Sequence, residues 1–531
     1  MRNFLYLLPC LFLFACGKQA PVSIDIVPYP QDVKASGKWV VIDEPLAIQS
    51  DQDFAGLTKV LSDYVSNWNS TFGKTAANGF PLIVEIDESI HESAEAYQLS
   101  AVDDQIKLVG RSAKGVFYGL QTLQQLMVVH GNEIHLPELE ITDYPDFGWR
   151  SYLLDESRYF KGKAFVMGLL DELAALKINK LHWHLTDDAG WRIEIKKYPK
   201  LTSVGAYRDS TQINHEGKRW NSKVYDGKPH GGFYTQAEIK EIIAYAAARN
   251  IDIVPEIEMP GHASAAIAAY PWLGVIGKLT KVPTYFGKLD DSYNVTDPKV
   301  IQFLHDVLDE VCELFPSEVI HIGGDEVLFE SWRNSKQVQA YMKKHQLKTP
   351  ADLQIRFTNE ISSYLEKKGK RMMGWNEILG QNIHNFENAE DYNPETELSK
   401  QSVIHFWRGE IPLITDAAQK GYEIVNSLHS ETYLDYTYEG LPLSRLYKFN
   451  PIPEGLDSAY HKNIIGLGTQ MWSEWTPTVK DVEYQTFPRI AAFAEVAWSG
   501  SGDYEDFVSR LKIFSARWTE KGINFPAEQI K

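Results

Sequence analysis

Residues 318–327 read E-V-I-H-I-G-G-D-E-V and combine a buried strand with two adjacent acids. The apolar, β-branched run predicts a strand, and it stops at Gly323 and Gly324. Asp325 and Glu326 follow at once, although neighbouring carboxylates repel each other. Because α/β enzymes build their sites at the carboxyl ends of strands, this stretch predicts both a strand of a parallel sheet and a functional site at its end.

The same unit of a strand and a following helix repeats from residue 146 onward. Strands are predicted at 150–155, 178–184, 251–257, 318–322, 370–375, 402–407, 422–427 and 464–472. Helices are predicted at 162–176, 236–249, 298–314, 352–368 and 484–498. Eight such units over this length predict a (β/α)8 TIM barrel. An open, doubly wound sheet would more often carry a glycine-rich phosphate loop after its first strand, and the sequence has none there.

The part of the chain before the barrel has a mixed pattern. Strand-like runs at 39–42, 81–86, 97–102 and 106–109 alternate with helical stretches near 53–68 and 113–129. This alternation predicts a small α+β domain. The segment I-T-D-Y-P-D-F-G-W at 141–149 is the expected boundary, so we predict an N-terminal α+β domain at 17–145 and a barrel domain at 146–531. Residues 382–400 are expected to form a surface insertion.

The first sixteen residues predict a lipoprotein-type signal peptide at 1–16. One arginine precedes an apolar stretch from Phe4 to Phe14, which is too short to span a bilayer comfortably. The ending L-F-A-C resembles a bacterial lipobox, which implies cleavage before Cys16 and a lipid anchor on its thiol; ordinary signal cleavage or a retained anchor is the alternative. Cys312 is then the one other thiol of the mature chain, so no internal disulfide is expected. We expect an exported protein in the periplasm or at the outer membrane or cell surface of a Gram-negative bacterium.

Composition narrows the function classes further. The 531 residues carry a formal charge of −18, which argues against a nucleic-acid partner because phosphate binding needs a concentrated basic face. The chain has 14 tryptophans, whose flat rings suit the apolar faces of sugars, although most tryptophans in any protein belong to the core.

Polar and aromatic residues gather at the ends of the predicted strands, and most are weak signals when taken singly. An aspartate such as Asp155 or Asp188 can cap the next helix, and His321 inside its strand is expected to be core. Together they combine paired carboxylates with aromatic walls, which are the ingredients of glycoside hydrolysis. The residues in question are Asp155, Arg158, His182, His184, Asp187, Asp188, Glu256, Glu258, His262, Asp325, Glu326, Trp375, Trp407, Tyr433, Asp435, Trp472 and Glu474.

Three other interpretations compete with glycoside hydrolysis. G-G-D-E also occurs in a nucleotide-cyclising signalling motif, but that motif needs a small stand-alone domain and basic phosphate-binding residues. His182 and His184 form an H-x-H pair, as in metal-dependent amidohydrolases, where the pair lies on the first barrel strand rather than on the second. A catalytically inactive, sugar-binding barrel is the third alternative. The favoured interpretation includes no metal and no cofactor.

Five segments of the barrel resemble the β-N-acetylhexosaminidases of glycoside hydrolase family 20. They are R-S-Y-L-L-D-E-S-R-Y-F (150–160), K-L-H-W-H-L-T-D-D (180–188), E-I-E-M-P-G-H (256–262), H-I-G-G-D-E-V (321–327) and T-Q-M-W-S-E-W (469–475), in the family's order across about 146–500. Residues 96–100 (A-Y-Q-L-S) and 115–126 (G-V-F-Y-G-L-Q-T-L-Q-Q-L) are similar to the family's N-terminal domain. The resemblance implies a glycan substrate and the release of terminal GlcNAc, GalNAc or both from the non-reducing end.

The resemblance also implies a retaining, substrate-assisted mechanism, in which the acetamide of the sugar is the nucleophile. Glu326 would be the proton donor and then the base, Asp325 would accept the acetamide N–H, and Tyr433 would hold the acetamide oxygen.

Further roles follow from the same resemblance. Trp375, Trp407 and Trp472 would enclose the acetamide methyl and the sugar ring. Arg158, Asp435 and Glu474 would bind the outer hydroxyls, Asp187 and His262 would support the acid, and His184 and Trp332 would lie near the site. Residues 270–287 are expected on the leaving-group side. The oligomeric state stays open.

Overall fold

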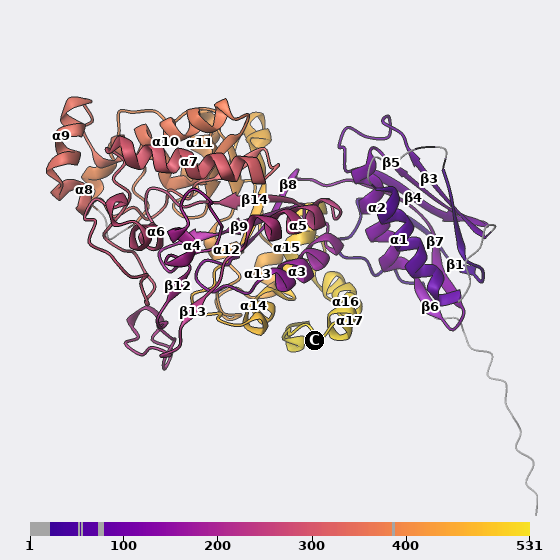
Figure 1. Ribbon diagram of the computed structural model, residues 1–531. Helices are drawn as coiled ribbons and strands as arrows, with labels where there is room; N and C mark the ends of the chain where they lie inside the picture. The colour runs from indigo at the N-terminus through magenta and orange to yellow at the C-terminus, as the bar shows by residue number, and fades with distance from the viewer. Residues whose placement is uncertain are drawn as a thin grey trace, which may run out of the picture.

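The computed structural model describes residues 22–50, 52, 54, 57–72, 79–384 and 388–530 (Figure 1). The predicted signal peptide, with Cys16, lies outside these residues. In the described part of the chain, no helix is long and apolar enough to cross a membrane.

The N-terminal region is a mixed sheet with two helices, at the right of Figure 1. The strand order is β1-β7-β4-β5-β3-β2, and β6 pairs with β7. The elements are β1 (Asp32–Ile42), β2 (Leu46–Gln49), α1 (Thr58–Asn69), η1 (Ser70–Phe72), β3 (Phe80–Ile86), β4 (Tyr97–Val102), β5 (Gln105–Gly110), α2 (Ala113–Leu126), β6 (Val128–His130) and β7 (Glu133–Asp143). The four predicted strands and both predicted helices are present in this region.

The sequence pattern does not predict strand β7, although at 11 residues it is as long as β1 and pairs with β1, β4 and β6. It contains Pro137, and a proline argues against an interior strand because it has no N–H to donate. The structure resolves this conflict locally: β6 pairs with β7 at 133–135 and β4 pairs at 139–143, so Pro137 falls between the two partners. On the other edge it faces Trp39, next to an irregularity in β1.

The predicted barrel is confirmed as a closed ring of eight parallel strands, in the order β14-β15-β16-β17-β18-β19-β8-β9. Each predicted strand is found within a few residues of its expected place. The strands are β8 (Trp149–Asp155), β9 (Lys180–His184), β14 (Asp252–Glu256), β15 (Val319–His321), β16 (Arg371–Trp375), β17 (Val403–Phe406), β18 (Glu423–Asn426) and β19 (Ile464–Met471).

The helices that follow the strands start at the signals the sequence carries. Thr235 and Glu238 form a capping box at α5, Thr349 and Asp352 form one at α10, and Asp297 caps α7. The helices of the outer layer are α3 (Lys163–Ala175), α5 (Gln236–Ala247), α7 (Pro298–Leu314), α10 (Pro350–Lys367), α11 (Pro412–Gln419), α13 (Leu443–Tyr447), α14 (Val479–Thr486) and α15 (Arg489–Ser499). The prediction of one helix at 484–498 is wrong at its start. Residues 484–486 belong to α14, and α15 begins only after Pro488, which interrupts the helix.

The loops at the carboxyl ends of the strands contain short elements of their own. After β9 come β10 (Thr186–Asp187), β11 (Gly190–Trp191), α4 (Lys200–Ser203), β12 (Tyr207–Arg208), η2 (Arg219–Asn221) and β13 (His230–Gly231). After β14 come α6 (Ser264–Ala269) and η3 (Pro271–Leu273), and after β15 come α8 (Glu330–Asn334) and α9 (Lys336–Lys344). Later strands carry η4 (Asn376–Leu379), η5 (Ala389–Tyr392), α12 (His429–Thr432) and η6 (Ser458–Asn463); α16 (Tyr504–Phe514), α17 (Ala516–Glu520) and η7 (Ala527–Ile530) end the described chain.

A buried network joins the N-terminal sheet to the barrel. The Asp143 carboxylate, at the end of β7, lies 2.8 Å from the Lys177 ammonium, and both side chains are fully buried. The same carboxylate accepts hydrogen bonds from the Trp498 indole at 2.9 Å and the Tyr97 hydroxyl at 2.6 Å. One buried carboxylate is therefore shared by residues of the N-terminal sheet and of the barrel.

Candidate active site

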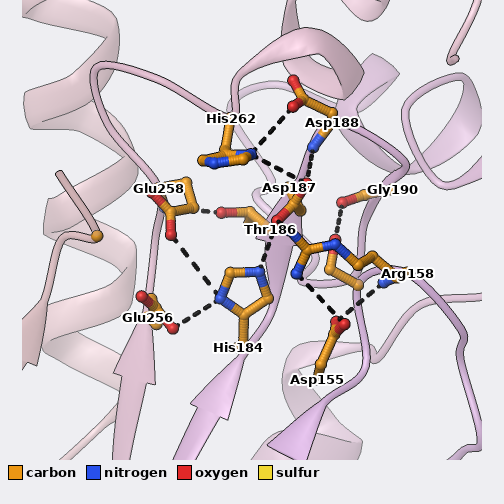
Figure 2. A network of polar contacts seen from close by, with 12 residues as sticks. Asp155, Arg158, His184, Thr186, Asp187, Asp188, Gly190, Glu256, Glu258 and His262 are labelled. Carbon is orange, nitrogen blue, oxygen red and sulfur yellow. Dashed lines mark hydrogen bonds and ion pairs between the residues drawn. The ribbon is translucent and has the colours of Figure 1, made fainter. Parts of the chain in front are cut away.

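The polar residues predicted at the strand ends meet at one rim of the barrel. β8 ends at Asp155, β9 at His184, β14 at Glu256 and β16 at Trp375, and the side chains of the first three point into the shared network of Figure 2. This convergence follows from the parallel strands, since all their carboxyl ends lie on one face of the barrel.

The two glycines before Asp325 and Glu326 make room for a buried acid. Gly323 has φ of +66°, and a Cβ built there would lie 1.7 Å from the Glu258 carboxylate. Gly324 has φ of +91°, and Glu326 itself has φ of +49°, a conformation that is uncommon for a residue with a side chain. The close packing of Glu258 therefore requires the glycine, and the turn that follows holds Asp325 and Glu326 at the rim.

Asp325 is a buried carboxylate with an unused acceptor. Its Oδ1 atom is buried and has no hydrogen-bond partner among the described residues. Burial raises the pKa of Asp325 to about 8, with further raising by Glu377 and Glu326, while His262 opposes the shift. A carboxyl group in this position favours a ligand that brings an N–H or O–H donor to it.

Glu326 lies beside two cationic or ionisable groups. Its Oε1 is 3.2 Å from the ammonium of Lys288, and its Oε2 is 3.8 Å from the Nε2 of His262. The Glu326 side chain is 21% exposed, more than the 13% of Asp325. The two neighbouring acids therefore face different surroundings, with Glu326 closer to the open side of the rim.

His184 links the second and third strands of the barrel domain. Its Nδ1 lies 2.6 Å from Glu256, and its Nε2 lies 2.9 Å from Asp187 (Figure 2). Burial disfavours a charged imidazole, but the two carboxylates outweigh it and raise the pKa of His184 to about 10. The imidazolium is thus held in place as a bridge between two buried acids.

Arg158 is surrounded by carboxylates. Its guanidinium lies 2.8 Å from Asp187, 3.4 Å from Asp155 and 3.4 Å from Glu474. It also stacks over the ring of Trp472, with 5.0 Å between the guanidinium carbon and the ring centroid. The planar fork is therefore fixed before any ligand arrives, which suits a directional contact with sugar hydroxyls.

His262 connects the Asp187–Asp188 pair to the catalytic candidates. Its Nδ1 is 3.0 Å from Asp188 and 3.5 Å from Asp187, and its Nε2 is 3.9 Å from Asp325. Burial alone would lower the pKa of His262, but Asp187 and Asp188 raise it well above its ordinary value. The positive charge that results lies between two pairs of acids and partly offsets their mutual repulsion.

The rings of three tryptophans and a tyrosine lie next to one another at this rim of the barrel. The indole of Trp375 donates to Glu256 at 2.8 Å, and the indole of Trp407 donates to Glu377 at 2.9 Å. The ring of Tyr433 is parallel to that of Trp407, with centroids 6.0 Å apart, and lies 6.3 Å from Trp472. The rings are thus locked by hydrogen bonds and by one another.

Asp435 and Glu474 are the outer acids of the site. The Oδ1 of Asp435 is buried without a partner among the described residues, and burial together with Glu474 raises the pKa of Asp435 to about 8. Burial also raises the pKa of Glu474, against the pull of Arg158. Both groups retain acceptor capacity that hydroxyl groups of a ligand can use.

The structure brings together the predicted site residues with one exception. Trp332 is fully buried in α8 and packs on Phe329, with ring centroids 5.4 Å apart. Within the described ranges it has no hydrogen bond or ring contact with the other predicted site residues. Its burial and its contact with Phe329 fit a packing role within the segment that follows β15.

The sequence prediction assigns no individual role to several residues at the site. Glu256 and Glu258 stand at a strand end without a predicted role, and for Asp155 and Asp188 helix capping is the alternative that the sequence leaves open. Asp188 accepts a hydrogen bond from the Ser264 N–H at the start of α6, as a helix cap does. Asp155 accepts a hydrogen bond from the Ser473 N–H, which follows the last barrel strand. Lys288 lies in a long loop that carries no periodic signal, so sequence patterns could not find it.

Three groups of buried residues have donor atoms close enough for a metal ion. They are His182–His321–His405, His184–Glu256–Glu258 and Asp187–Asp188–His262. Most of these side chains are engaged with each other or with neighbours: His405 contacts Ser427 at 2.8 Å and His321 at 3.3 Å, and His321 contacts Glu256 at 3.0 Å. The donor sets therefore fit an internal hydrogen-bond network as well as they fit a cation.

A barrel whose rim holds paired carboxylates, an arginine and a wall of tryptophans defines a glycoside hydrolase. Residues 147–501 match the family model for the catalytic domain of glycosyl hydrolase family 20, and residues 23–144 match the model for domain 2 of the same family. The chain belongs to glycosyl hydrolase family 20, and the predicted kinship is confirmed.

Named relatives agree with this assignment. A β-hexosaminidase of Porphyromonas gingivalis is 34% identical over 97% of this chain and 67% of its own length. The crystal structure of the exo-β-N-acetylglucosaminidase of Vibrio harveyi, in complex with N-acetylglucosamine, superposes with a TM-score of 0.81 at 30% identity, over 96% of this chain and 79% of that one. The X-ray structure of the chitobiase of Flavobacterium johnsoniae superposes with a TM-score of 0.79 at 32% identity, over 94% of this chain and 73% of that one.

Proposed function

We propose that the protein is an exo-acting, retaining β-N-acetylhexosaminidase that uses the acetamide group of its substrate as the nucleophile. The observation that carries the proposal is the Asp325 carboxylate, whose buried Oδ1 has no hydrogen-bond partner in the described part of the chain and which is followed directly by the Glu326 carboxylate. An acetamide N–H would fill that vacancy and would favour the ionised form of Asp325. No separate enzyme nucleophile is then required.

In the first step, the acetamide oxygen attacks the anomeric carbon while Glu326 gives its proton to the departing glycosidic oxygen. The acetamide becomes an oxazolinium ion, and its positive charge is stabilised by Asp325, which accepts the N–H. The Tyr433 hydroxyl orients the acetamide oxygen, and the rings of Trp407 and Trp375 limit the space for the methyl group.

In the second step, Glu326 accepts a proton from water as the water attacks the same anomeric carbon from the face that the leaving group left. The C–O bond to the acetamide breaks, and the sugar is released with its original anomeric configuration. Two displacements at one carbon give net retention.

Exo action is supported by the crowded end of the site. Arg158, Asp435 and Glu474 surround the place that the outer hydroxyls of the terminal sugar would occupy, and Trp472 lies beneath Arg158. Such a set recognises one terminal residue. A preference for GlcNAc or GalNAc depends on how these acids meet the O4 hydroxyl.

The proposal is tested with aryl β-N-acetylglucosaminides and galactosaminides. We expect aryl release, a β-configured sugar as the first product in NMR spectra, and a single sugar removed at a time from defined glycans. Glu326→Gln should reduce cleavage of natural oligosaccharides far more than that of activated aryl glycosides, since a good leaving group needs little protonation. Equal losses would place the acid elsewhere.

The inactive, sugar-binding alternative predicts binding of N-acetylhexosamine without any release at any pH. The Asp325–Glu326 pair and Tyr433 argue against it, because a binding protein has no need of a proton donor beside the acetamide acceptor.

We also propose that the protein is exported and held at a membrane by a lipid on Cys16. This rests on the sequence of residues 1–16 alone. Cys16→Ala should move the protein from the detergent-soluble membrane fraction to the soluble fraction, and an unchanged distribution would contradict the anchor.

A further inference from the structure

A buried glutamate that has no part in the proposed reaction contacts the acetamide pocket, the space that we propose Trp375, Trp407 and Tyr433 to enclose. Glu377 is 3% exposed, and its carboxylate accepts a hydrogen bond from the Trp407 indole, at 2.9 Å to Oε2 and 3.2 Å to Oε1. The Nε2 of His384 lies 3.0 Å from the same Oε1. Both oxygens of Glu377 are thus engaged, and turning the indole away would deprive a buried carboxylate of a donor.

The backbone of Trp407 is fixed from two sides. Its N–H donates to the Asn376 side chain at 3.0 Å, and its carbonyl accepts from the His429 N–H at 2.8 Å. The Asn376 amide also donates to the carbonyl of Arg408 at 3.0 Å. Asn376 lies in η4 after β16, and His429 begins α12 after β18. The neighbouring strand ends therefore hold the backbone of Trp407, and Glu377 holds its ring.

The charge of Glu377 also acts on the proposed acceptor of the acetamide. Burial raises the pKa of Asp325, and the negative charge of Glu377 raises it further. Glu377 can therefore influence the pocket through its hydrogen bond to Trp407 and through its charge. A variant that keeps the hydrogen-bond acceptor but removes the charge separates these two effects.

The orientation of Trp407 matters because the acetamide is the proposed nucleophile. A misplacement of reacting groups by about 1 Å can lower a rate about 10²-fold. The Trp407 ring is parallel to that of Tyr433, with centroids 6.0 Å apart, and its centroid lies 6.5 Å from that of Trp375. A rotation of the indole would change the space between these rings, where we place the methyl group.

We propose that Glu377 is a positioning residue of the acetamide pocket, which holds the Trp407 indole and thereby sets the orientation and the size of the N-acyl group that reacts. The inference rests on the proposed hexosaminidase function and adds a residue that acts on the nucleophile without touching the substrate. Glu377 acts through Trp407.

The test compares aryl glucosaminides that differ only in the N-acyl group, which is acetyl in one and propionyl in the other. Because both have the same leaving group, the ratio of their kcat/KM values reports the acyl pocket and not the proton donor. For the wild type we expect a ratio of about ten or more in favour of acetyl, as for one extra methylene in a packed site.

Variants of Glu377 connect this ratio to the indole. Glu377→Ala removes both acceptor oxygens, so kcat for the acetyl substrate should fall about 10–100-fold, with a smaller loss for propionyl and a ratio at least about fivefold lower. Glu377→Gln keeps an acceptor for the indole and should retain the ratio within about twofold. Glu241→Ala is the matched control, because Glu241 is 61% exposed and pairs with Lys163 at 2.7 Å. It should leave both rates unchanged.

A double-mutant cycle tests whether Glu377 acts through the ring. Trp407→Phe has no indole N–H, so Glu377→Ala should change the ratio much less in that background than in the wild type. Thermal unfolding shows whether each variant is folded. If Glu377→Ala does not fold, Glu377→Met takes its place, since it fills the space without an oxygen acceptor.

Three results would overturn the inference: no discrimination between the acyl groups by the wild type, an unchanged ratio in the folded Glu377→Ala or Glu377→Met variant, or equal changes with and without the Trp407 indole. Cleavage of the acetyl substrate by the wild type separates this failure from that of the proposed function. If it is cleaved, only the role of Glu377 is wrong; if no N-acylglucosaminide or N-acylgalactosaminide is cleaved, the proposed function fails and the inference falls with it.

Discussion

Asp143 and Asp325 are both buried aspartates, yet their surroundings are opposite. The Oδ1 of Asp143 accepts from the N–H groups of Gln31, Tyr144 and Trp498, and its Oδ2 accepts from Tyr97 and Lys177. The Oδ1 of Asp325 is buried without a donor among the described residues, and its nearest cationic group is His262 at 3.9 Å. Both oxygens of Asp143 are hydrogen-bonded within the protein, whereas Asp325 keeps one oxygen without a donor in the described part of the chain.

The difference separates structural charge from functional charge. A buried acid with all of its acceptors used stabilises the fold, because desolvation is compensated within the protein. A buried acid with an unused oxygen costs stability in the empty protein, and a ligand with the matching donor recovers that cost. Asp435 falls in the second class, since its Oδ1 is also buried with no hydrogen-bond partner within the described ranges.

The largest expected effect is on stability, at the junction. Asp143→Asn removes the charge that neutralises Lys177, whose side chain is fully buried, and a buried cation without its partner costs about 3–5 kcal/mol. Chemical denaturation at neutral pH should show this loss, while kcat changes little.

Asp63→Asn is the matched control for this variant, since Asp63 pairs with Lys59 on the surface with both side chains well exposed. It should change the free energy of unfolding by less than about 0.5 kcal/mol. Equal effects of the two variants would contradict the structural role of Asp143.

For Asp325 we expect the opposite result, a loss of activity without a loss of stability. Asp325→Asn removes an acceptor that we place at the charged acetamide, so kcat/KM should fall about 10²–10³-fold, the range for losing one preorganised electrostatic contact. The midpoint of thermal unfolding should stay equal or rise, because no internal donor loses a partner. A large drop in stability would show that Asp325 is structural like Asp143.

The pH dependence of stability sharpens the same comparison. The folded pKa of Asp325 is raised to about 8, above the unfolded value near 4, so the native state keeps a proton that the unfolded state has lost. The stability this group contributes is complete below about pH 4 and is lost as pH rises toward about 8. The unfolding midpoint of Asp325→Asn relative to wild type should therefore increase from about pH 5 to about pH 8; a constant difference would argue against a raised pKa.

Sequence patterns predicted the barrel and the location of its site because both depend on local periodicity and on strand order. All eight strands were found from apolar runs, and polar residues at their ends had to meet on one face. The patterns failed where tertiary contacts decide, as for Pro137 in β7, which is tolerated only because two different strands flank it.

The chemistry of individual groups was beyond the sequence for a similar reason. Glu377 follows Trp375 by two residues, but only the fold shows that it holds the Trp407 indole. Lys288 lies in a loop whose path depends on Phe286 and Gln212. That Asp325 keeps an unused oxygen while Asp143 does not is a property of the assembled neighbours and not of either local sequence.

A smaller effect is expected at Arg158, which has partners in the empty site and also faces the proposed position of the sugar. Arg158→Lys keeps the charge but loses the planar fork that reaches Asp187, Asp155 and Glu474. Losing one charged hydrogen bond, about 1.5–3 kcal/mol, should lower kcat/KM about 10–100-fold. Steady-state kinetics on an aryl glycoside would measure it, and unchanged kinetics would mean that one ammonium is sufficient.

The smallest expected effect is that of a chelator, which should leave activity unchanged. His182, His321 and His405 could together surround a cation, but His321 and His405 already contact Glu256 and Ser427. The metal-dependent amidohydrolase alternative predicts a loss on prolonged treatment with EDTA and recovery with a divalent cation. Because a fully buried ion leaves slowly, elemental analysis of the purified protein accompanies the assay. The prediction is wrong if the protein contains a stoichiometric metal and its removal abolishes aryl release. These histidines would then resemble Asp325, whose hydrogen bonding a ligand completes, and not Asp143, whose partners all lie within the protein.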